Sequence, residues 1–260
     1  MIAIITGAYG AIGKAIVEGV AQHGFEVVMV GRNEEKLMTA VHEMSKKVPG
    51  SVIHYKALDL SREKEIINFS REWTGPLHLL INNAATAPRR RTETPEGIEM
   101  QFAANVLSYF WMTHYFLGYI IDPSFARIVN VASYWAGDLD LRDLEFRKRN
   151  YNSDTAYRQS KQANMMLTAV FAEQLKPKGI TINVCHPGDV NSKLSNDLGF
   201  GGHETPEQGA DTPVWLAVSR DVSGTTGQYF EHRRRQSCPF IKNKKESDEL
   251  FQICLNYCTV

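Results

Sequence analysis

The chain opens with the stretch Ile2-Ala3-Ile4-Ile5-Thr6-Gly7-Ala8-Tyr9-Gly10-Ala11-Ile12-Gly13, which carries its clearest structural signal. The apolar run predicts a short buried strand, the glycines predict a tight turn, and residues 11–23 have the pattern of a helix. Such a strand-to-helix turn suits a nucleotide pyrophosphate, because small residues let the backbone approach and the helix amides attract phosphate. A tight turn without any ligand is the alternative, since a glycine turn alone is weak support.

The pattern of the first strand and helix continues along the chain. Five further apolar runs occupy residues 27–30, 52–55, 77–81, 128–131 and 180–184, and segments of helical length occupy residues 34–47, 63–73, 96–121 and 155–175. This alternation predicts right-handed βαβ units. We therefore expect an α/β fold, namely a single Rossmann domain over residues 1–260 with a doubly wound parallel sheet of about seven strands and helices on both faces. A cofactor half would span roughly residues 1–132 and a catalytic half residues 133–260.

Composition excludes several classes of function. Lys plus Arg and Asp plus Glu each total 29, and this balance argues against a nucleic-acid partner. Four irregularly spaced cysteines predict neither a disulfide framework nor a metal site. The first strand starts almost at Met1, and polar residues such as Asn105 interrupt the apolar stretch 102–121. We therefore expect a cytoplasmic protein without a signal peptide or transmembrane segment, while peripheral membrane contact remains open.

Tyr157 and Lys161 stand four residues apart in the predicted helix 155–175, and this spacing places them on one helix face. A lysine ammonium beside a phenol favours its ionised form, and an oxidised nicotinamide ring would add a second positive charge. Tyrosine ordinarily ionises near pH 10, so such neighbours would let it act as an acid or base near neutrality.

Arg32 follows the second predicted strand, where no Asp or Glu ends the strand. An acidic residue at this place would accept from the ribose 2′-hydroxyl of NAD, whereas an arginine pairs with the 2′-phosphate of NADP. We therefore expect NADP(H) to be preferred over NAD(H), although a solvated arginine is the alternative. Asp59 follows the third strand and either accepts from the adenine amino group or serves as a turn or N-cap residue.

In their order along the chain, these motifs resemble those of the short-chain dehydrogenase/reductase family, and the resemblance covers nearly the whole chain. Four features are similar to its retinol-dehydrogenase-like branch: Leu79-Leu80-Ile81-Asn82-Asn83-Ala84-Ala85, Gly97-Ile98-Glu99-Met100-Gln101-Phe102, the long gap between Ser133 and Tyr157, and Gly224-Thr225-Thr226-Gly227-Gln228-Tyr229-Phe230. The resemblance implies that Tyr157 is the general acid/base and that Lys161 lowers its pKa and holds the nicotinamide ribose. It implies that Ser133 hydrogen-bonds the substrate oxygen and that Asn105 supports a water leading to solvent.

The resemblance also implies a set of residues around the dinucleotide: Gly7, Tyr9, Gly10, Ala11, Ile12, Gly13, Arg32, Asp59, Leu60, Asn83, Ala84, Tyr157, Lys161, Pro187, Gly188, Val190 and Ser192. Within this set, residues 82–85 would border the adenosine ribose, and residues 187–192 would clamp the nicotinamide amide through backbone and hydroxyl groups. Plain turns are the alternative for both segments. The chain departs from the family pattern at Ala11 and Ala85, where glycine is usual, and the added methyl groups are expected to tighten the turn or weaken dinucleotide binding.

Together these features predict an NADP(H)-dependent oxidoreductase that interconverts an alcohol and a carbonyl on a small lipophilic or aromatic substrate. A dinucleotide-sensing binding protein without turnover is the main alternative, although a sensor needs no proton relay. An epimerase of the extended branch shares the Tyr-x-x-x-Lys spacing but normally needs a longer substrate domain.

Three surface features complete the prediction. Residues 137–153 and 191–212 are candidate substrate loops, or else ordinary insertions. The cluster Arg89-Arg90-Arg91 borders the pocket mouth in one hypothesis and forms a solvated face in the other. The apolar content of residues 102–121 and 165–175 suggests a homodimer face between helices, with a monomer as the alternative.

Overall fold

A computed structural model describes residues 1–120 and 125–259, and its central feature is one sheet. Within these residues the strand order is β3-β2-β1-β4-β5-β6-β7-β8, and neighbouring strands pair in parallel from β3 through β7. The strands are β1 (Ile2–Thr6), β2 (Glu26–Gly31), β3 (Ile53–Ala57), β4 (Leu79–Asn82), β5 (Arg127–Val131), β6 (Thr181–Cys185), β7 (Tyr229–Glu231) and β8 (Arg234–Gln236). The predicted doubly wound parallel sheet is thus confirmed.

The strand β8 is the addition to the expected seven. It pairs antiparallel with β7 at the sheet edge, and all three of its residues are exposed. Because Arg234-Arg235-Gln236 contains no apolar side chain, hydrophobic periodicity gives no sign of this strand.

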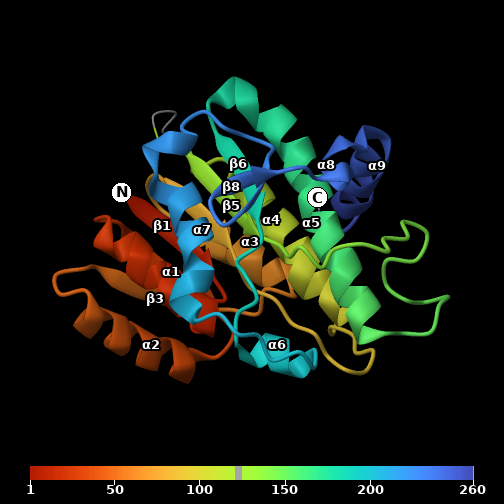
Figure 1. Cartoon of the computed structure of the whole chain (residues 1–260), viewed down its shortest axis with the longest axis horizontal. Helices are drawn as coiled ribbons and strands as arrows, with labels where there is room; N and C mark the ends of the chain where they lie inside the picture. Colours follow the sequence, from red (N-terminus) through yellow and green to blue (C-terminus); the bar gives the residue numbers. More distant parts are fainter. Residues whose placement is uncertain (121–124, 260) are drawn as a thin grey trace.

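Helices cover both faces of the sheet (Figure 1). Apolar side chains of α1 (Ala11–Gln22), α2 (Glu34–Lys47) and α7 (Pro206–Val218) form one core layer. Those of α3 (Glu63–Glu72), α4 (Ser108–Phe116) and α5 (Ser153–Leu175) form the core on the other face. The remaining helical segments are short or terminal: the 3-10 turns Lys176–Lys178 and Arg220–Val222, α6 (Lys193–Asp197), α8 (Pro239–Lys242) and α9 (Lys244–Leu255).

The strand order reverses between β1 and β4, which lie side by side at the centre of the sheet. In an open α/β sheet, ligands bind beyond the carboxyl ends of the strands at such a switch point. Thr6 ends β1 and Asn82 ends β4, so the glycine turn and the segment after β4 meet there.

The helix expected over residues 96–121 begins later and is not uniform. Residues 96–99 form a turn and a short bridge between Glu93 and Glu99, and a π-helical segment, Phe102–Leu107, then leads into α4. Gly97 has a φ of 79°, a left-handed conformation that no α-helix contains. Residue 121 lies outside the described residues.

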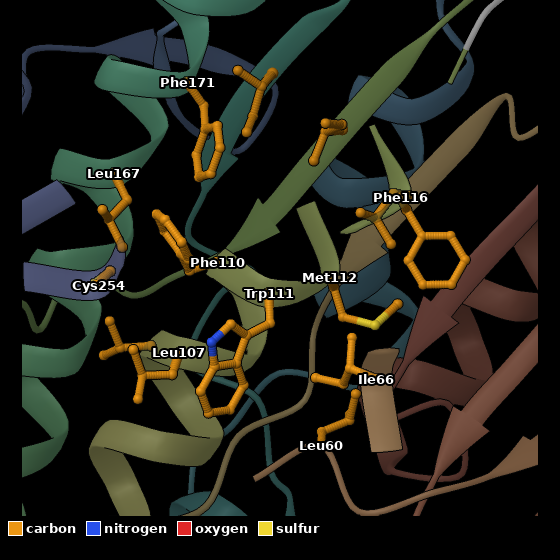
Figure 2. Close-up of a cluster of buried hydrophobic side chains, with 14 of the residues drawn as sticks. Leu60, Ile66, Leu107, Phe110, Trp111, Met112, Phe116, Leu167, Phe171 and Cys254 are labelled. Atoms are coloured by element: carbon orange, nitrogen blue, oxygen red, sulfur yellow. The ribbon is translucent and has the colours of Figure 1, made fainter. Parts of the chain in front are cut away.

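The C-terminal helix α9 covers the apolar face that suggested a dimer. Figure 1 shows α9 beside α5, and Figure 2 shows Phe110 of α4 close to Leu167 and Phe171 of α5, with Cys254 of α9 near them. The rings of Phe110, Phe171 and Phe251 form a triangle with centroid separations of 5.1–5.3 Å. The surplus apolar surface of α4 and α5 is therefore buried within the same chain.

Among the residues that the structure describes, we find no helix with both the length and the apolarity needed to span a bilayer.

Candidate active site

The glycine turn after β1 is closely packed, and this explains its composition. Gly7 has a φ of 64°, and a methyl group added there would lie 2.8 Å from Ala84 Cα. A methyl group added at Gly13 would lie 2.2 Å from the carbonyl oxygen of Gly7. The N-cap of α1 is Gly10, which offers no side chain to the first-turn amides. The turn therefore leaves backbone donors at a helix N-terminus, the arrangement that binds a pyrophosphate.

Thr6 connects this turn to the segment after β4. Its buried hydroxyl accepts hydrogen bonds from the backbone amides of Asn83 (2.9 Å) and Ala84 (3.1 Å). In return, Asn83 Nδ2 donates to the Thr6 carbonyl oxygen at 3.0 Å. Two segments that are 77 residues apart in sequence are thus held together at the switch point. We expected Asn83 and Ala84 at this site, whereas the connecting role of Thr6 was missed.

The carboxyl ends of β2 and β3 hold the residues expected to contact the adenosine. Arg32 is exposed just after β2, and among the described residues it forms no ion pair. The ring of Tyr9 covers Gly31, where an added methyl group would lie 2.5 Å from Tyr9 Cε1. Asp59 Oδ1 accepts from the backbone amide (3.0 Å) and the hydroxyl (2.7 Å) of Ser61, as in the turn alternative, and Leu60 is buried.

Ser133 and Tyr157 lie together in a narrow cleft of about 60 Å³. Ser133 follows β5, and Tyr157 lies in the second turn of α5, whose N-terminus is capped by Asn152. Both side chains are buried, and the Ser133 side chain acts to lower the pKa of Tyr157. The cleft is also lined by Ile12, Pro187, Gly188, Val190 and Ser192, so it joins the glycine turn to the segment after β6.

Burial dominates the electrostatics of this pair and its lysine. Desolvation raises the pKa of Tyr157 well above 10, and the hydrogen bond from Ser133 only partly opposes it. Burial lowers the pKa of Lys161 from 10.5 to about 7. Lys161 Nζ donates to the Val131 carbonyl oxygen at 3.1 Å and lies 5.5 Å from the centroid of the Tyr157 ring. In the protein without a dinucleotide, the expected lowering of the tyrosine pKa is therefore absent, because desolvation outweighs the neighbouring amine.

The side chain of Asn105 fixes backbone instead of contacting Tyr157 or Lys161. It lies in the π-helical segment and is fully buried. Its Oδ1 accepts from the Thr86 amide at 2.8 Å, and its Nδ2 donates to the Thr86 carbonyl oxygen at 2.9 Å. Nδ2 also lies 3.2 Å from Ser160 Oγ, one residue before Lys161. Asn105 thus joins the loop after β4 to the helix that carries Tyr157 and Lys161.

The segment after β6 folds back on itself around Gly188. Gly188 has a φ of 110°, and a methyl group added there would lie 1.8 Å from Glu204 Oε2. Val190 is buried and forms a parallel bridge with Glu204, and Glu204 Oε2 is buried without a hydrogen-bond partner. The Ser192 hydroxyl, which we expected at the nicotinamide, accepts from the Ser195 amide at 3.2 Å as the N-cap of α6.

Aromatic residues that sequence reasoning missed form the mouth of the cleft. Tyr134 is 59% exposed and Phe200 is 49% exposed, an unusual state for large apolar side chains. The Trp135 ring packs edge-on against Phe200, with centroids 5.4 Å apart, and lies 6.2 Å from the Tyr157 ring. His186, at the end of β6, meets the Tyr134 ring edge-on at 4.6 Å. Tyr134, Trp135 and His186 were marked in the sequence only by their position next to Ser133 or Pro187, and Phe200 only by its place in the candidate substrate loop 191–212.

The two candidate substrate loops differ in their relation to the cleft. Residues 191–212 supply cleft-lining side chains through Ser192, α6 and Phe200. Residues 137–153 supply none in the part of the chain that the structure describes, and backbone amides of residues 147–149 instead surround the Asp143 carboxylate. This loop packs on α5, where Gln159 Nε2 donates to the Leu144 carbonyl oxygen at 2.7 Å.

The arginine cluster lies apart from the cleft lining. Arg89 and Arg90 are exposed, while Arg91 donates to the Glu145 carbonyl oxygen at 3.0 Å and pairs with Glu93 at 2.7 Å. None of the three lines the described cleft, and the solvated-face alternative fits these contacts.

Comparison with known proteins yields consistent matches. A family model described as short chain dehydrogenase matches residues 1–199. Retinol dehydrogenase 11 from Mus musculus is 32% identical over 243 residues, which cover 88% of this chain and 77% of that protein. A crystal structure of an uncharacterized protein from Mycobacterium paratuberculosis superimposes with a TM-score of 0.81 at 24% identity, covering 98% of this chain and 93% of that one. A 3-oxoacyl (acyl-carrier-protein) reductase from Agrobacterium tumefaciens with NADP bound gives a TM-score of 0.71 at 22% identity, covering 88% of this chain and 91% of that one.

Proposed function

This chain belongs to the short-chain dehydrogenase/reductase family, with retinol-dehydrogenase-like relatives, and we propose that it is an NADP(H)-dependent oxidoreductase that interconverts an alcohol and a carbonyl. The proposed substrate is small and lipophilic or aromatic. The observation that carries the proposal is the buried pair of Ser133 and Tyr157, whose side chains line one cleft that also reaches the glycine turn.

The residues present fit a bound dinucleotide. Methyl groups at Gly7 or Gly13 would collide with the backbone of Ala84 or of Gly7, so only glycine allows this tight turn, and the uncapped start of α1 offers donors to a pyrophosphate. When bound, the dinucleotide supplies or accepts a hydride. Pro187, Gly188 and Val190 would border its nicotinamide end, and Lys161 would meet the ribose.

The two hydroxyl groups have distinct roles at the reacting carbonyl. As the carbonyl carbon is reduced, negative charge develops on its oxygen, and both hydroxyl groups donate hydrogen bonds to it. Tyr157 then transfers its proton to the oxygen, and Ser133 keeps the oxygen in place. Lys161, whose Nζ lies 5.5 Å from the centroid of the Tyr157 ring, would return a proton to the phenol after each cycle.

Arg32 supports the preference for NADP(H). It stands exposed after β2 without an ion-pair partner among the described residues, and Tyr9 lies over the neighbouring Gly31. A guanidinium in this position is free to form bidentate hydrogen bonds with a 2′-phosphate.

The protonation state of Tyr157 suits its proposed role as the acid in carbonyl reduction. Because burial raises the pKa of Tyr157 well above 10, its phenol carries a proton at neutral pH. A protonated phenol is the acid that reduction requires, whereas alcohol oxidation requires the phenolate.

The test is cofactor oxidation with a panel of aldehydes and ketones, with NADPH and NADH measured in parallel. We expect NADPH to be consumed at the higher kcat/KM, and Arg32→Glu to reverse the preference without abolishing NADH turnover. Arg89→Glu serves as the matched control, since it makes the same charge change at an exposed arginine away from the cleft. A preference for NADH in the native protein would contradict the NADP(H) assignment.

A second outcome separates catalysis from sensing. In this outcome the protein binds NADPH but does not oxidise it with any member of the panel, and Tyr157→Phe changes neither binding nor turnover. This result would favour a dinucleotide-sensing protein over the proposed enzyme.

A further inference from the structure

His186 is the one side chain lining the described cleft that has a buried polar atom without a partner. His186 directly follows β6, and its backbone amide donates to the Phe230 carbonyl oxygen of β7 at 3.0 Å. Its imidazole is 93% buried (7% exposed) and lines the cleft with Ser133 and Tyr157, yet Nδ1 has no hydrogen-bond partner. Buried polar groups in native proteins are nearly always satisfied, so an unpartnered atom in a residue that lines the cleft marks a candidate contact for a bound molecule.

The surroundings of the imidazole are aromatic and uncharged on the cleft side. Tyr134 meets the ring edge-on, and Trp135 and Phe200 continue the wall. Burial lowers the pKa of His186 to about 4, so the ring is neutral at physiological pH. The only charged residue that lines the described cleft is Asp189, whose carboxylate is paired with His203 Nδ1 at 3.2 Å. A neutral imidazole in such a wall recognises an uncharged hydroxyl or carbonyl oxygen.

We propose that His186 is a specificity-determining residue whose Nδ1 hydrogen-bonds a second oxygen of the substrate, in addition to the oxygen held by Ser133 and Tyr157. This inference rests on the proposed carbonyl reductase function. The substrate class is an aryl aldehyde or ketone that carries a further hydroxyl or carbonyl group. Its ring occupies the space between Tyr134 and Trp135, where edge-on aromatic contacts are favourable.

Entry of such a substrate requires Phe200 to move. The cleft of about 60 Å³ is far below the roughly 300 Å³ or more of typical ligand pockets. Phe200 lies between Gly199 and Gly201, which have φ values of 90° and 73°, and its ring packs on Trp135. The ring of the substrate therefore replaces Phe200 as the partner of Trp135 when the cleft opens.

The test compares acetophenone with its 2′-, 3′- and 4′-hydroxy isomers in native protein, His186→Leu, His186→Asn and His186→Gln. We expect kcat/KM for one hydroxy isomer to exceed that for acetophenone by about tenfold to a hundredfold in the native protein. In His186→Leu this ratio falls to about one, because no polar atom remains. His186→Asn retains part of the ratio and His186→Gln does not, since only the asparagine amide reaches the position of Nδ1.

The dissociation constant of NADPH, measured by its fluorescence, shows whether Nδ1 of His186 contacts the substrate or the dinucleotide. Unchanged NADPH binding in His186→Leu, together with the loss of the ratio, supports the substrate contact. Weakened NADPH binding with an unchanged ratio assigns Nδ1 to the dinucleotide and overturns the inference, and an equal ratio in all four proteins overturns it as well. If the native protein reduces the plain and hydroxylated ketones equally, the inference fails while the proposed function stands. If it reduces neither, both fail together.

Discussion

The chemistry of individual residues in this site is set by burial. Tyr157 and Lys161 are 6% and 2% exposed, and desolvation favours the neutral form of each. It raises the pKa of Tyr157 and lowers the pKa of Lys161. The result is a neutral phenol that is ready to act as an acid. Among the described residues, the Ser133 side chain is the polar neighbour that lowers the pKa of this phenol.

This state of Tyr157 predicts opposite pH profiles for the two reaction directions. Carbonyl reduction needs the protonated phenol, so its kcat/KM should not rise with pH between pH 6 and about 8. Alcohol oxidation needs the phenolate, whose fraction rises with pH because the pKa of Tyr157 lies above 10. We therefore expect the oxidation kcat/KM to rise about tenfold per pH unit over this range. A level profile for oxidation would show that the phenol is not the titrating base.

The burial of Lys161 predicts that replacing this lysine stabilises the fold although it abolishes turnover. The fold holds an amine whose pKa is lowered from 10.5 to about 7, so burying it costs stability. Lys161→Met should abolish turnover and raise the free energy of unfolding at pH 7 by about 2 kcal/mol. The Val131 carbonyl oxygen still accepts from the Tyr109 hydroxyl at 3.1 Å, so the substitution leaves it paired.

The sign of the pH dependence provides the control for Lys161→Met. Below pH 7 the amine is charged in both folded and unfolded chains, so the cost is complete and constant. Between pH 7 and 10.5 the folded amine is neutral while the unfolded one keeps its proton, so the cost shrinks as pH rises. The stability advantage of the variant, measured by urea unfolding, should vanish near pH 10.5. An advantage that is independent of pH would contradict burial of the charge as its cause.

At this scale the sequence predicted the proposed reacting groups but not their supporting contacts. Tyr157, Lys161 and Ser133 could be proposed because their types, spacing and order are specific. The contacts of Asn105 with Thr86 and the unpartnered Nδ1 of His186 depend on which backbone happens to lie beside each side chain. No local pattern encodes that information.

Among the structural elements, the segment between β6 and α7 is the most constrained near the cleft. Gly188 contacts the carboxylate of Glu204, and residues 189–191 pair with residues 203–204 by backbone hydrogen bonds of 2.8–3.0 Å. This pairing fixes the start of the candidate substrate loop, residues 191–212, which carries α6 and Phe200.

Gly188→Ala should therefore weaken NADPH binding by about tenfold or more and lower the melting temperature, because the added methyl group would lie 1.8 Å from Glu204 Oε2. Gly199→Ala is the matched control: its φ of 90° brings similar backbone strain, yet no atom lies within 4 Å of the added methyl group. Fluorescence titration and thermal melting of both variants check this. Equal losses would mean that backbone strain, not the collision with Glu204, is responsible.

Element boundaries were predicted well where local signals act and poorly where tertiary contacts decide. The catalytic helix α5 was expected from residue 155 and begins at Ser153, and α2 agrees at both ends. The helix expected over residues 96–121 was wrong at its start, because the Glu99 carboxylate accepts from the amides of Gln101 and Phe102 and so caps a later start. The strand β8 is held by pairing with β7 and has no hydrophobic pattern of its own.

For the whole molecule, α9 covers apolar side chains of α4 and α5, the helices whose apolar content suggested a dimer face. Leu250 and Cys254 are fully buried and Phe251 is 6% exposed, and all three belong to the core cluster that contains side chains of α4 and α5. Figure 2 shows Cys254 near Phe110 and Leu167. The parallel sheet itself was predictable from alternating strands and helices. The packing of α9 on α4 and α5 could not be predicted, because apolar surface on these helices is compatible with a helix from the same chain or from another chain.

Phe251→Asp should release α9, with a loss of about 3 kcal/mol or more in stability, because a charge replaces a buried ring in the Phe110–Phe171 cluster. The uncovered face of α4 and α5 should then cause self-association, detected as a concentration-dependent mass by sedimentation velocity. Gln252→Asp introduces the same charge at the neighbouring exposed position and should leave both stability and mass unchanged. A Phe251→Asp variant as stable and monodisperse as the Gln252→Asp control would contradict the covering role of α9.

The most direct test of the central claim follows the hydride and the proton donor together. NADPH carrying deuterium at both C4 positions of the nicotinamide is incubated with an aryl ketone, and the product alcohol is analysed by mass spectrometry for native protein and Tyr157→Phe. We predict one deuterium on the carbinol carbon with native protein and a loss of at least about a hundredfold in rate with Tyr157→Phe at unchanged NADPH affinity. Alcohol formed without deuterium, or formed equally fast by Tyr157→Phe, would contradict hydride transfer with Tyr157 as the acid.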